Sequence, residues 1–96
     1  MQYTFLTDPG HGWMCVTRSE IIRLGLSEKI SRFSYQKGEL VYLEEDCDAS
    51  RFLAEKRDRN EPFTIKETHT DRDHWIRHLQ PFSAETASVG WTSVTA

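Results

Sequence analysis

The residues most able to do chemistry near the start of the chain lie in the loop "TDPGHGWMCV", residues 7–16. His11 could act as a general base beside Asp8, and Cys15 could serve as a nucleophile. However, the loop matches neither the phosphate-binding nor the dinucleotide-binding glycine pattern. Cys15 also lies in an apolar run, where a cysteine is usually buried and unreactive. We therefore predict a structural turn and no catalytic residue.

A second candidate is the acidic cluster "EEDCD", in which carboxylates surround Cys47: Glu44, Glu45, Asp46 and Asp48. Packed carboxylates can bind a hard cation or raise one another's pKa. The cluster lacks the spaced ligands and the glycine of an EF-hand loop, and it directly precedes an expected helix, whose N-terminus favours negative charge. The sequence therefore favours helix capping and a solvated acidic surface, with no metal.

The third candidate is a set of histidines near the C-terminus. His74 and His78 are four residues apart and so share a face, and His69, Asp71 and Asp73 lie close by in sequence. Imidazole and carboxylate groups are ordinary zinc ligands, but the HExxH pattern is absent. We interpret these histidines as surface residues of an edge strand and expect neither a metal nor another cofactor.

The elements that must position these groups begin with two strands. "QYTFL" (residues 2–6) alternates polar and apolar residues, and "WMCV" (13–16) resumes an extended run, so "DPGHG" should connect two antiparallel strands. We expect Gly10 or Gly12 to have positive φ and Trp13 to pack against the core. Two glycines in so short a connection are typical of a tight turn.

A short helix, "RSEIIRLG", should follow, with Thr17 and Glu20 as its capping box. Gly25 suits the left-handed position that ends a helix. The expected buried side consists of Ile21, Ile22 and Leu24.

The next segment, "KISRFSYQKGELVYLE", predicts a hairpin with its turn at Gly38, and its apolar run "LVYL" should lie at the centre of the sheet. Asp48 is the expected N-cap of a second helix, "ASRFLAEKRDRN", with Ala49, Phe52 and Leu53 buried. "FTIKETH" and "HWIRHLQ" should then pair across the polar turn "TDRD".

This order predicts a small α+β domain, ββα-ββα-ββ, with a mainly antiparallel sheet and two short helices. We expect a single domain over residues 1–82 and a flexible C-terminal tail over residues 83–96, which is small, polar and almost uncharged.

Composition narrows the classes of function. The 96 residues carry a formal net charge of -3, which disfavours a general polyanion binder, and two cysteines without a CxxC pair. The N-terminus lacks the basic and apolar regions of a secretory leader, and no apolar run is long enough to span a membrane. These features predict a soluble, cytoplasmic protein with reduced thiols.

The string "DPGHGW…VTRSEIIRLGL…KISRFSYQKG…VYLEEDCDA" resembles a family of small uncharacterised proteins of phage, prophage and plasmid origin. The resemblance covers about residues 5 to 53. It implies a mobile-element context, in which small proteins often bind a host protein and modulate or block it.

A more distant resemblance links "VTRSEIIRLGLSEKISRFSYQKGELVYLE" to the strand–helix–hairpin unit of AbrB/MazE swapped-hairpin DNA binders. The shared features are the strand-to-helix entry at Val16–Thr17, "LGL" at the helix end, "EKI", and a glycine turn before an apolar strand. This chain has no proline at Thr17 or Arg18, and an acidic run follows the unit.

Our first hypothesis is a non-catalytic interaction protein that binds a basic surface of a host protein, such as a defence or nucleic-acid-processing factor. Aromatic residues often provide much of the contact energy at such surfaces. The expected partner-binding residues are Glu39, Glu44, Glu45, Asp46, Asp48, Tyr35 and Tyr42.

The second hypothesis is a homodimeric DNA-binding regulator. Its phosphate contacts would come from Arg18, Arg23, Lys29, Arg32 and Lys37. A zinc-dependent or thiol enzyme is the third and least favoured hypothesis. None of the three requires a membrane.

Overall fold

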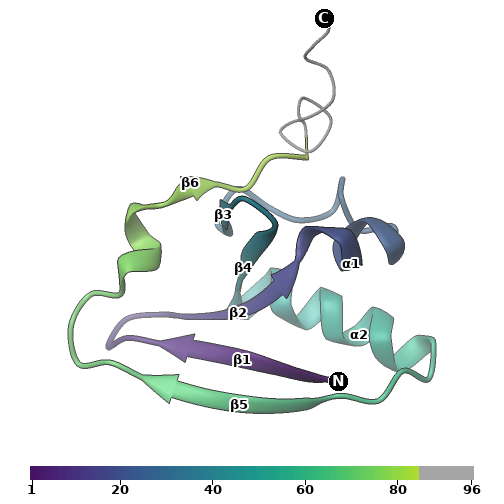
Figure 1. Cartoon of the computed structure of the whole chain (residues 1–96), viewed down its shortest axis with the longest axis horizontal. Coiled ribbons are helices and arrows are strands. Elements are labelled where there is room, and N and C mark those ends of the chain that lie inside the picture. The colour runs from purple at the N-terminus through teal and green to yellow at the C-terminus, as the bar shows by residue number, and fades with distance from the viewer. Residues whose placement is uncertain (85–96) are drawn as a thin grey trace, which may run out of the picture.

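The computed structural model describes residues 1–84, which form a small α+β domain around one six-stranded sheet (Figure 1). The strands are β1 (Gln2–Thr7), β2 (Gly12–Thr17), β3 (Tyr35–Lys37), β4 (Leu40–Glu44), β5 (Thr64–His69) and β6 (Gln80–Pro81). Their order across the sheet is β5-β1-β2-β4-β3-β6, and every neighbouring pair is antiparallel except β1 and β5. The predicted α+β class and mainly antiparallel sheet are confirmed.

Two α-helices and two short helical turns connect these strands. The α-helices are α1 (Arg18–Arg23) and α2 (Ser50–Asp58); a π-helical turn (Glu45–Ala49) leads into α2, and a 3-10 turn (Trp75–His78) precedes β6. Within residues 1–84, no helix has the length and apolar character that crossing a membrane requires. Most of the predicted tail, residues 85–96, lies outside the described residues.

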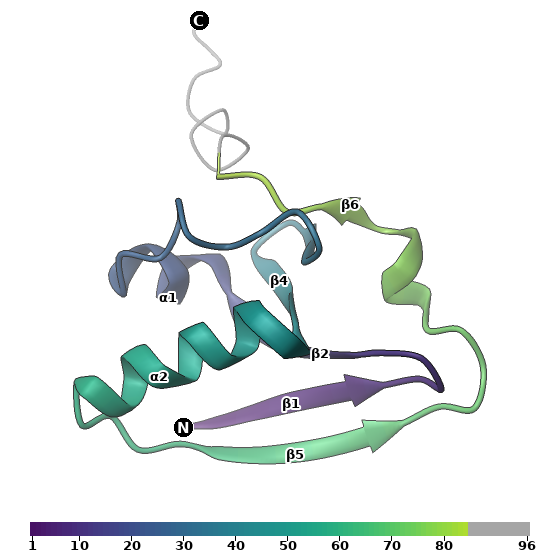
Figure 2. The same ribbon diagram turned by 180° about the vertical axis from the view of Figure 1, so that it is seen from behind.

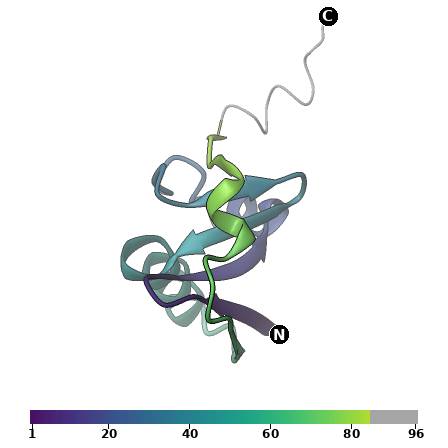
Figure 3. The ribbon, with the colours of Figure 1, turned by 90° about the vertical axis from the view of Figure 1, so that its left-hand side faces the viewer.

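Alternating side chains give the sheet two apolar faces. Figure 2 shows α2 on the near side of the sheet. One face packs against α1 and α2 and holds the larger cluster, which includes Met14, Val41 and Phe52. The other face holds Trp13 and Tyr42, which pack against Ile76 of the 3-10 turn. This turn lies at one end of the sheet, on the path from β5 to β6 (Figure 3). The expected burial of Trp13 is confirmed, because its side chain is only 2% exposed.

The "DPGHG" segment connects antiparallel strands, as predicted, but its glycines do not have positive φ. The carboxylate of Asp8 instead holds the turn by accepting hydrogen bonds from the backbone N–H groups of Gly10 and His11. Gly12 is required for space: a Cβ there would lie 2.8 Å from the ring of Phe5. The prediction that Gly10 or Gly12 has positive φ was therefore wrong.

Helix α1 begins after Thr17 and ends before Gly25, as predicted, but its capping box is only half formed. Thr17 Oγ1 accepts a hydrogen bond from the Glu20 N–H at 3.2 Å, and Gly25 has φ of +71° after the helix. The Glu20 carboxylate, however, bonds Tyr3 and Lys56 and not the backbone N–H of the cap.

The buried side of α1 differs from the prediction at one residue. Ile21 and Leu24 are buried, whereas Ile22 is 54% exposed and corrects the expectation for that residue. Successive helical residues point about 100° apart, and α1 packs against the rest of the domain on one side only, so Ile21 faces the core and Ile22 faces solvent.

The predicted β3–β4 hairpin is confirmed, with its turn at Gly38, where φ is +60°. Strand β4 lies between β2 and β3 in the interior of the sheet, and Val41 and Leu43 are fully buried. Leu40, at the first position of the strand, is partly exposed.

Two predictions for the second half of the chain were wrong. The helical segment is capped by Glu44, whose carboxylate accepts hydrogen bonds from the N–H groups of Asp46 and Cys47, and Asp48 lies inside the π-helical turn. "FTIKETH" pairs in parallel with β1, while "HWIRHLQ" forms the 3-10 turn. Strand β5 pairs with the free edge of β1 over six residues. Asp8 accepts a hydrogen bond from the backbone N–H of His74, which holds the start of "HWIRHLQ" beside Asp8.

Candidate functional site

A groove opens beside the smaller apolar cluster, where segments distant in sequence meet. We call it the Phe33 groove. It is lined by His11, Trp13, Arg32, Phe33, Tyr35, Glu44, Asp46, Cys47, Arg77 and Pro81. These residues come from the turn before β2 and its first residues, the segment before and within β3, the end of β4, the π-helical turn, the 3-10 turn and β6.

Aromatic side chains form the apolar part of the Phe33 groove. The buried ring of Trp13 meets Tyr35 edge to face, with 6.3 Å between ring centroids. Phe33 is 73% exposed, which leaves most of its ring in contact with solvent. A large aromatic side chain in such a position favours contact with another molecule, because burying it removes apolar surface from water.

The backbone that carries Phe33 is held by a buried carboxylate. Asp48 accepts hydrogen bonds from Ser31 N and Ser31 Oγ at 3.0 and 2.6 Å, and from Ser34 Oγ at 2.5 Å. Its side chain is one of the largest fully buried ones in the described chain. Asp48 therefore ties both sides of Phe33 to the turn before α2 and positions that ring at the groove.

Some charged side chains of the groove form ion pairs within the domain, and others do not. Arg77 donates to both carboxylate oxygens of Asp8, at 2.6 and 2.8 Å, and its guanidinium lies 5.4 Å from the Trp13 ring centroid. These bonds hold the pKa of Asp8 well below its usual range. In contrast, within residues 1–84, Arg32 and Asp46 are exposed and their side chains form no ion pair.

The structure brings together some of the expected partner-binding residues and separates the rest. Tyr35, Glu44 and Asp46 line the Phe33 groove, and Glu45 follows Glu44 directly. Glu39 lies at the opposite end of β4, where it accepts hydrogen bonds from Ser19.

Two expected contact residues, Tyr42 and Asp48, are buried, which corrects the expectation of one continuous acidic and aromatic surface. Tyr42 lies in the interior strand β4, and its side chain is on the sheet face that the 3-10 turn covers. Phe33 and Trp13 were not foreseen as site residues, and Arg32 was expected only as a phosphate contact of a DNA-binding protein. The available signal was the alternation of two aromatic residues with polar ones in "SRFSYQ", which indicated a strand but did not distinguish a buried ring from an exposed one.

The residues examined for catalysis do not assemble into a reactive set. Burial raises the pKa of the Cys15 thiol, which disfavours the reactive thiolate. His11 is exposed, and its nearest recorded ring contact is with Trp13, at 6.1 Å between centroids. His74 is buried and accepts a hydrogen bond from Ile76 N, whereas His78 is exposed. In the described part of the chain, no three His, Cys, Asp or Glu residues are grouped to hold a metal.

Two of the arginines expected to contact phosphate are occupied within the domain. Arg18 is buried and donates to Gln36 Oε1 at 2.9 Å. Arg23 donates to both carboxylate oxygens of Glu61, at 2.9 and 2.7 Å. A DNA interface built from the predicted residues would retain only Lys29, Arg32 and Lys37 as exposed cations that form no ion pair within residues 1–84.

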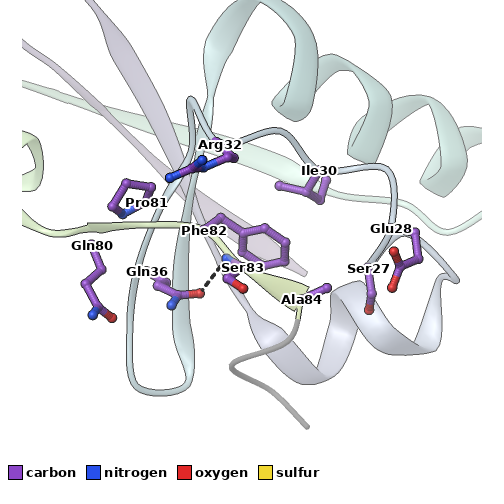
Figure 4. Close-up of a pocket in the computed structure, with 10 residues that line it drawn as sticks. All are labelled: Ser27, Glu28, Ile30, Arg32, Gln36, Gln80, Pro81, Phe82, Ser83 and Ala84. Atoms are coloured by element: carbon purple, nitrogen blue, oxygen red, sulfur yellow. Dashed lines mark hydrogen bonds between the residues drawn. The ribbon is translucent and has the colours of Figure 1, made fainter. Parts of the chain in front are cut away.

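A second hollow lies between the loop after α1 and the segment that follows β6 (Figure 4). Ser83 N donates to Gln36 Oε1 at 3.0 Å on one side, and Phe82 and Ile30 supply apolar surface. Ala84, the last described residue, belongs to its lining. We assign the candidate site to the Phe33 groove, whose lining includes the exposed Phe33 and extends no further along the chain than Pro81.

No protein-family model, curated protein or solved structure matches this chain.

Proposed function

We propose that this chain is a non-catalytic protein-binding domain, and that the Phe33 groove receives an apolar side chain and an adjacent basic residue of its partner. The observation that carries the proposal is the exposure of Phe33 on a segment that Asp48 fixes in place. A backbone segment already held in its binding conformation loses little conformational entropy on association.

The contact energy expected from this groove is appreciable. Fully burying a phenylalanine side chain contributes roughly 1.5–3 kcal/mol from apolar surface alone. Aromatic residues near the centre of an interface often dominate the binding energy, while surrounding residues mainly exclude water. Phe33 has Tyr35 and Pro81 beside it in the groove lining to provide that surround.

The charge of the groove indicates the chemistry of the partner. Asp46 is exposed, and Glu44 and Glu45 precede it, so the rim near the turn before α2 is acidic. A lysine or arginine of the partner would complement this rim, with its aliphatic stem against Phe33. In the mobile-element context that the resemblance implies, that partner is a host protein whose activity the domain modulates or inhibits.

The test compares capture of bacterial proteins by the wild type, Phe33→Ala and Asp46→Lys. The controls are Ile22→Ala, which removes an exposed apolar side chain on α1, and Asp58→Lys, which reverses an exposed charge at the end of α2. We expect one partner whose affinity falls at least about tenfold in both groove variants and stays unchanged in both controls. A partner captured equally by the groove variants, or the absence of any groove-dependent partner, would contradict the proposal.

A further inference from the structure

Strand β5 leaves one full edge of the sheet without a partner strand among residues 1–84. It is the terminal strand in the sheet order, and all six of its residues, Thr64–His69, are exposed. In Figure 1 it runs along the outside of β1 with nothing on its other side. Such an edge presents unpaired backbone N–H and C=O groups that can pair with another strand.

The hydrogen bonds to β1 identify which residues face the open edge. Thr64 N donates to Met1 O and Thr70 N donates to Thr7 O, both at 2.9 Å. Because inward and outward backbone groups alternate along a strand, the even-numbered residues from 64 to 70 face β1. The N–H and C=O groups of Ile65, Glu67 and His69 therefore face outward.

A second copy is the simplest partner for this edge, and its pairing is restricted by symmetry. A twofold axis perpendicular to the sheet makes the strands antiparallel and keeps each side chain on its own face. Two residues can therefore lie opposite each other only if their side chains are on the same face. The axis must then pass midway between one residue and the same residue of the second copy, which we call the central residue. With Ile65 or His69 as the central residue, only three residues of the extended segment 64–70 would pair with the second copy.

Repulsion between like charges excludes two of the three remaining central residues. An axis at Lys66 places Lys66 opposite itself, and an axis at Glu67 places Glu67 opposite itself in a hydrogen-bonded pair. Like charges directly opposite each other destabilise a sheet. An axis at Thr68 pairs the two copies of Thr68 and places Glu67 opposite His69 twice.

We propose that a second copy of this chain docks antiparallel on β5 in the register centred on Thr68, so that one sheet continues through both copies. Outward backbone groups of Glu67 and His69 would form about four hydrogen bonds across the axis. Each Glu67 carboxylate would then face His69 of the second copy, and the two threonines would meet at the centre. Cross-strand pairs of these kinds are stabilising.

The surroundings of His69 fit this arrangement. Its Nδ1 lies 2.7 Å from Thr7 Oγ1, and its Nε2 lies 3.2 Å from Asp71 Oδ1. Asp71 is 97% exposed, so its contact with the ring is a surface interaction that the opposing Glu67 can share or replace. Glu67 itself has no ion pair within residues 1–84. This interface does not use the Phe33 groove, since the two share no residue.

Cysteine cross-linking tests the register. Thr68→Cys, Lys66→Cys and Glu67→Cys would be made in a chain with Cys15 and Cys47 replaced by alanine, and oxidised at dimer-forming concentration. In the proposed register the two Thr68 Cα atoms are about 4.5 Å apart, within disulfide range, whereas the two Lys66 Cα atoms are separated by roughly 14 Å. We expect a cross-linked dimer for Thr68→Cys alone. Cross-linking at position 66 or 67, or at none, overturns the proposal.

Exchange of charge tests the pairing in the natural background. Sedimentation equilibrium of Glu67→His and of His69→Glu should show a dimer dissociation constant raised about tenfold or more, because each single change places like residues opposite. The double variant Glu67→His/His69→Glu restores opposite partners and should dimerise nearly as well as the wild type. Circular dichroism confirms that each variant is folded. A wild type that stays monomeric, or a double variant as weak as the singles, contradicts this interface.

Discussion

Lys56 and Glu20 form an ion pair in the interior, with Lys56 Nζ 2.8 Å from Glu20 Oε2 and only 4% and 9% of the two side chains exposed. Tyr3 donates a hydrogen bond to the same oxygen at 2.8 Å. Burial by itself raises the pKa of Glu20, but the bonds from Lys56 and Tyr3 outweigh it and leave that pKa below its usual value. The pair thus links β1, α1 and α2 through one carboxylate.

Lys56→Met should destabilise the fold strongly, because among residues 1–84 it leaves the buried Glu20 carboxylate with only the longer 3.3 Å ion-pair contact from the half-exposed Arg23. Removing one partner of a buried pair typically costs about 3–5 kcal/mol of unfolding free energy. Arg59→Met is the matched control, since Arg59 pairs with Glu55 on the surface and its loss should cost about 0.5 kcal/mol or less. Urea unfolding measures both. Equal effects in the two variants would show that the interior pair contributes no more than a surface one.

The same network predicts how stability depends on pH. Hydrogen bonds from Arg23 and Lys56 lower the pKa of Glu61 to about 2 from its usual 4.5, and the pKa of Glu20 is also lowered. A carboxyl with a depressed pKa stabilises the fold above its unfolded pKa and loses that contribution as pH falls through the folded value. We expect the unfolding free energy to be level from pH 7 to about 5 and to fall between about pH 4.5 and 2.

Urea titrations at several pH values check this profile. In Lys56→Met, the unfolding free energy should fall less steeply with decreasing pH. The substitution removes the cation that stabilises the ionised carboxylates of Glu20 and Glu61. An unchanged slope in that variant would assign the acid dependence to other groups, such as Asp8.

Local sequence signals predicted the first half of the fold well. Alternation indicated β1 and β2, and Thr17, Gly25 and Gly38 lie where a cap, a helix end and a turn were expected. These features depend on residues close in sequence. The parallel pairing of β5 with β1 joins residues about sixty positions apart, and nothing within "FTIKETH" distinguishes that partner from the next segment along the chain.

The candidate site was predictable in part for the same reason. Glu44 and Asp46 were identified from their charge, but the partners of Asp48 are Ser31 and Ser34, which no local pattern links to it. Phe33 becomes a groove residue only because those distant bonds fix its backbone. An isolated aromatic residue in a polar stretch does not reveal that constraint.

Asp48 and Asp46 should therefore respond oppositely to mutation. Asp48→Ala removes three hydrogen bonds to a buried carboxylate and should cost on the order of 3 kcal/mol of unfolding free energy. Asp46→Ala removes an exposed carboxylate and should change stability by about 0.5 kcal/mol or less, while weakening partner binding. Denaturation and binding measured on both variants check this separation. Loss of binding without loss of stability in Asp48→Ala would contradict the buried, positioning role.

Gly12 and Phe5 provide a test of packing at the start of β2. An added Cβ at Gly12 would lie 2.8 Å from two ring atoms of Phe5, so Gly12→Ala should cost about 1–3 kcal/mol of unfolding free energy through overpacking. Gly10→Ala is the comparison: its Cβ would lie 3.0 Å from Arg77 Nη2 and 3.9 Å from Asp8 Oδ1, so a shift of a few tenths of an ångström in the Arg77–Asp8 pair relieves the contact and the cost should be smaller.

Phe5→Leu removes the ring atoms in question, and its combination with Gly12→Ala decides between two causes. If the cost of Gly12→Ala comes from contact with the ring, the double variant should be more stable than the sum of the two single changes predicts. If the cost comes from backbone conformation, the two effects should add. Because neither Gly10 nor Gly12 is in the left-handed region, we expect the non-additive result, measured by urea unfolding of the four proteins.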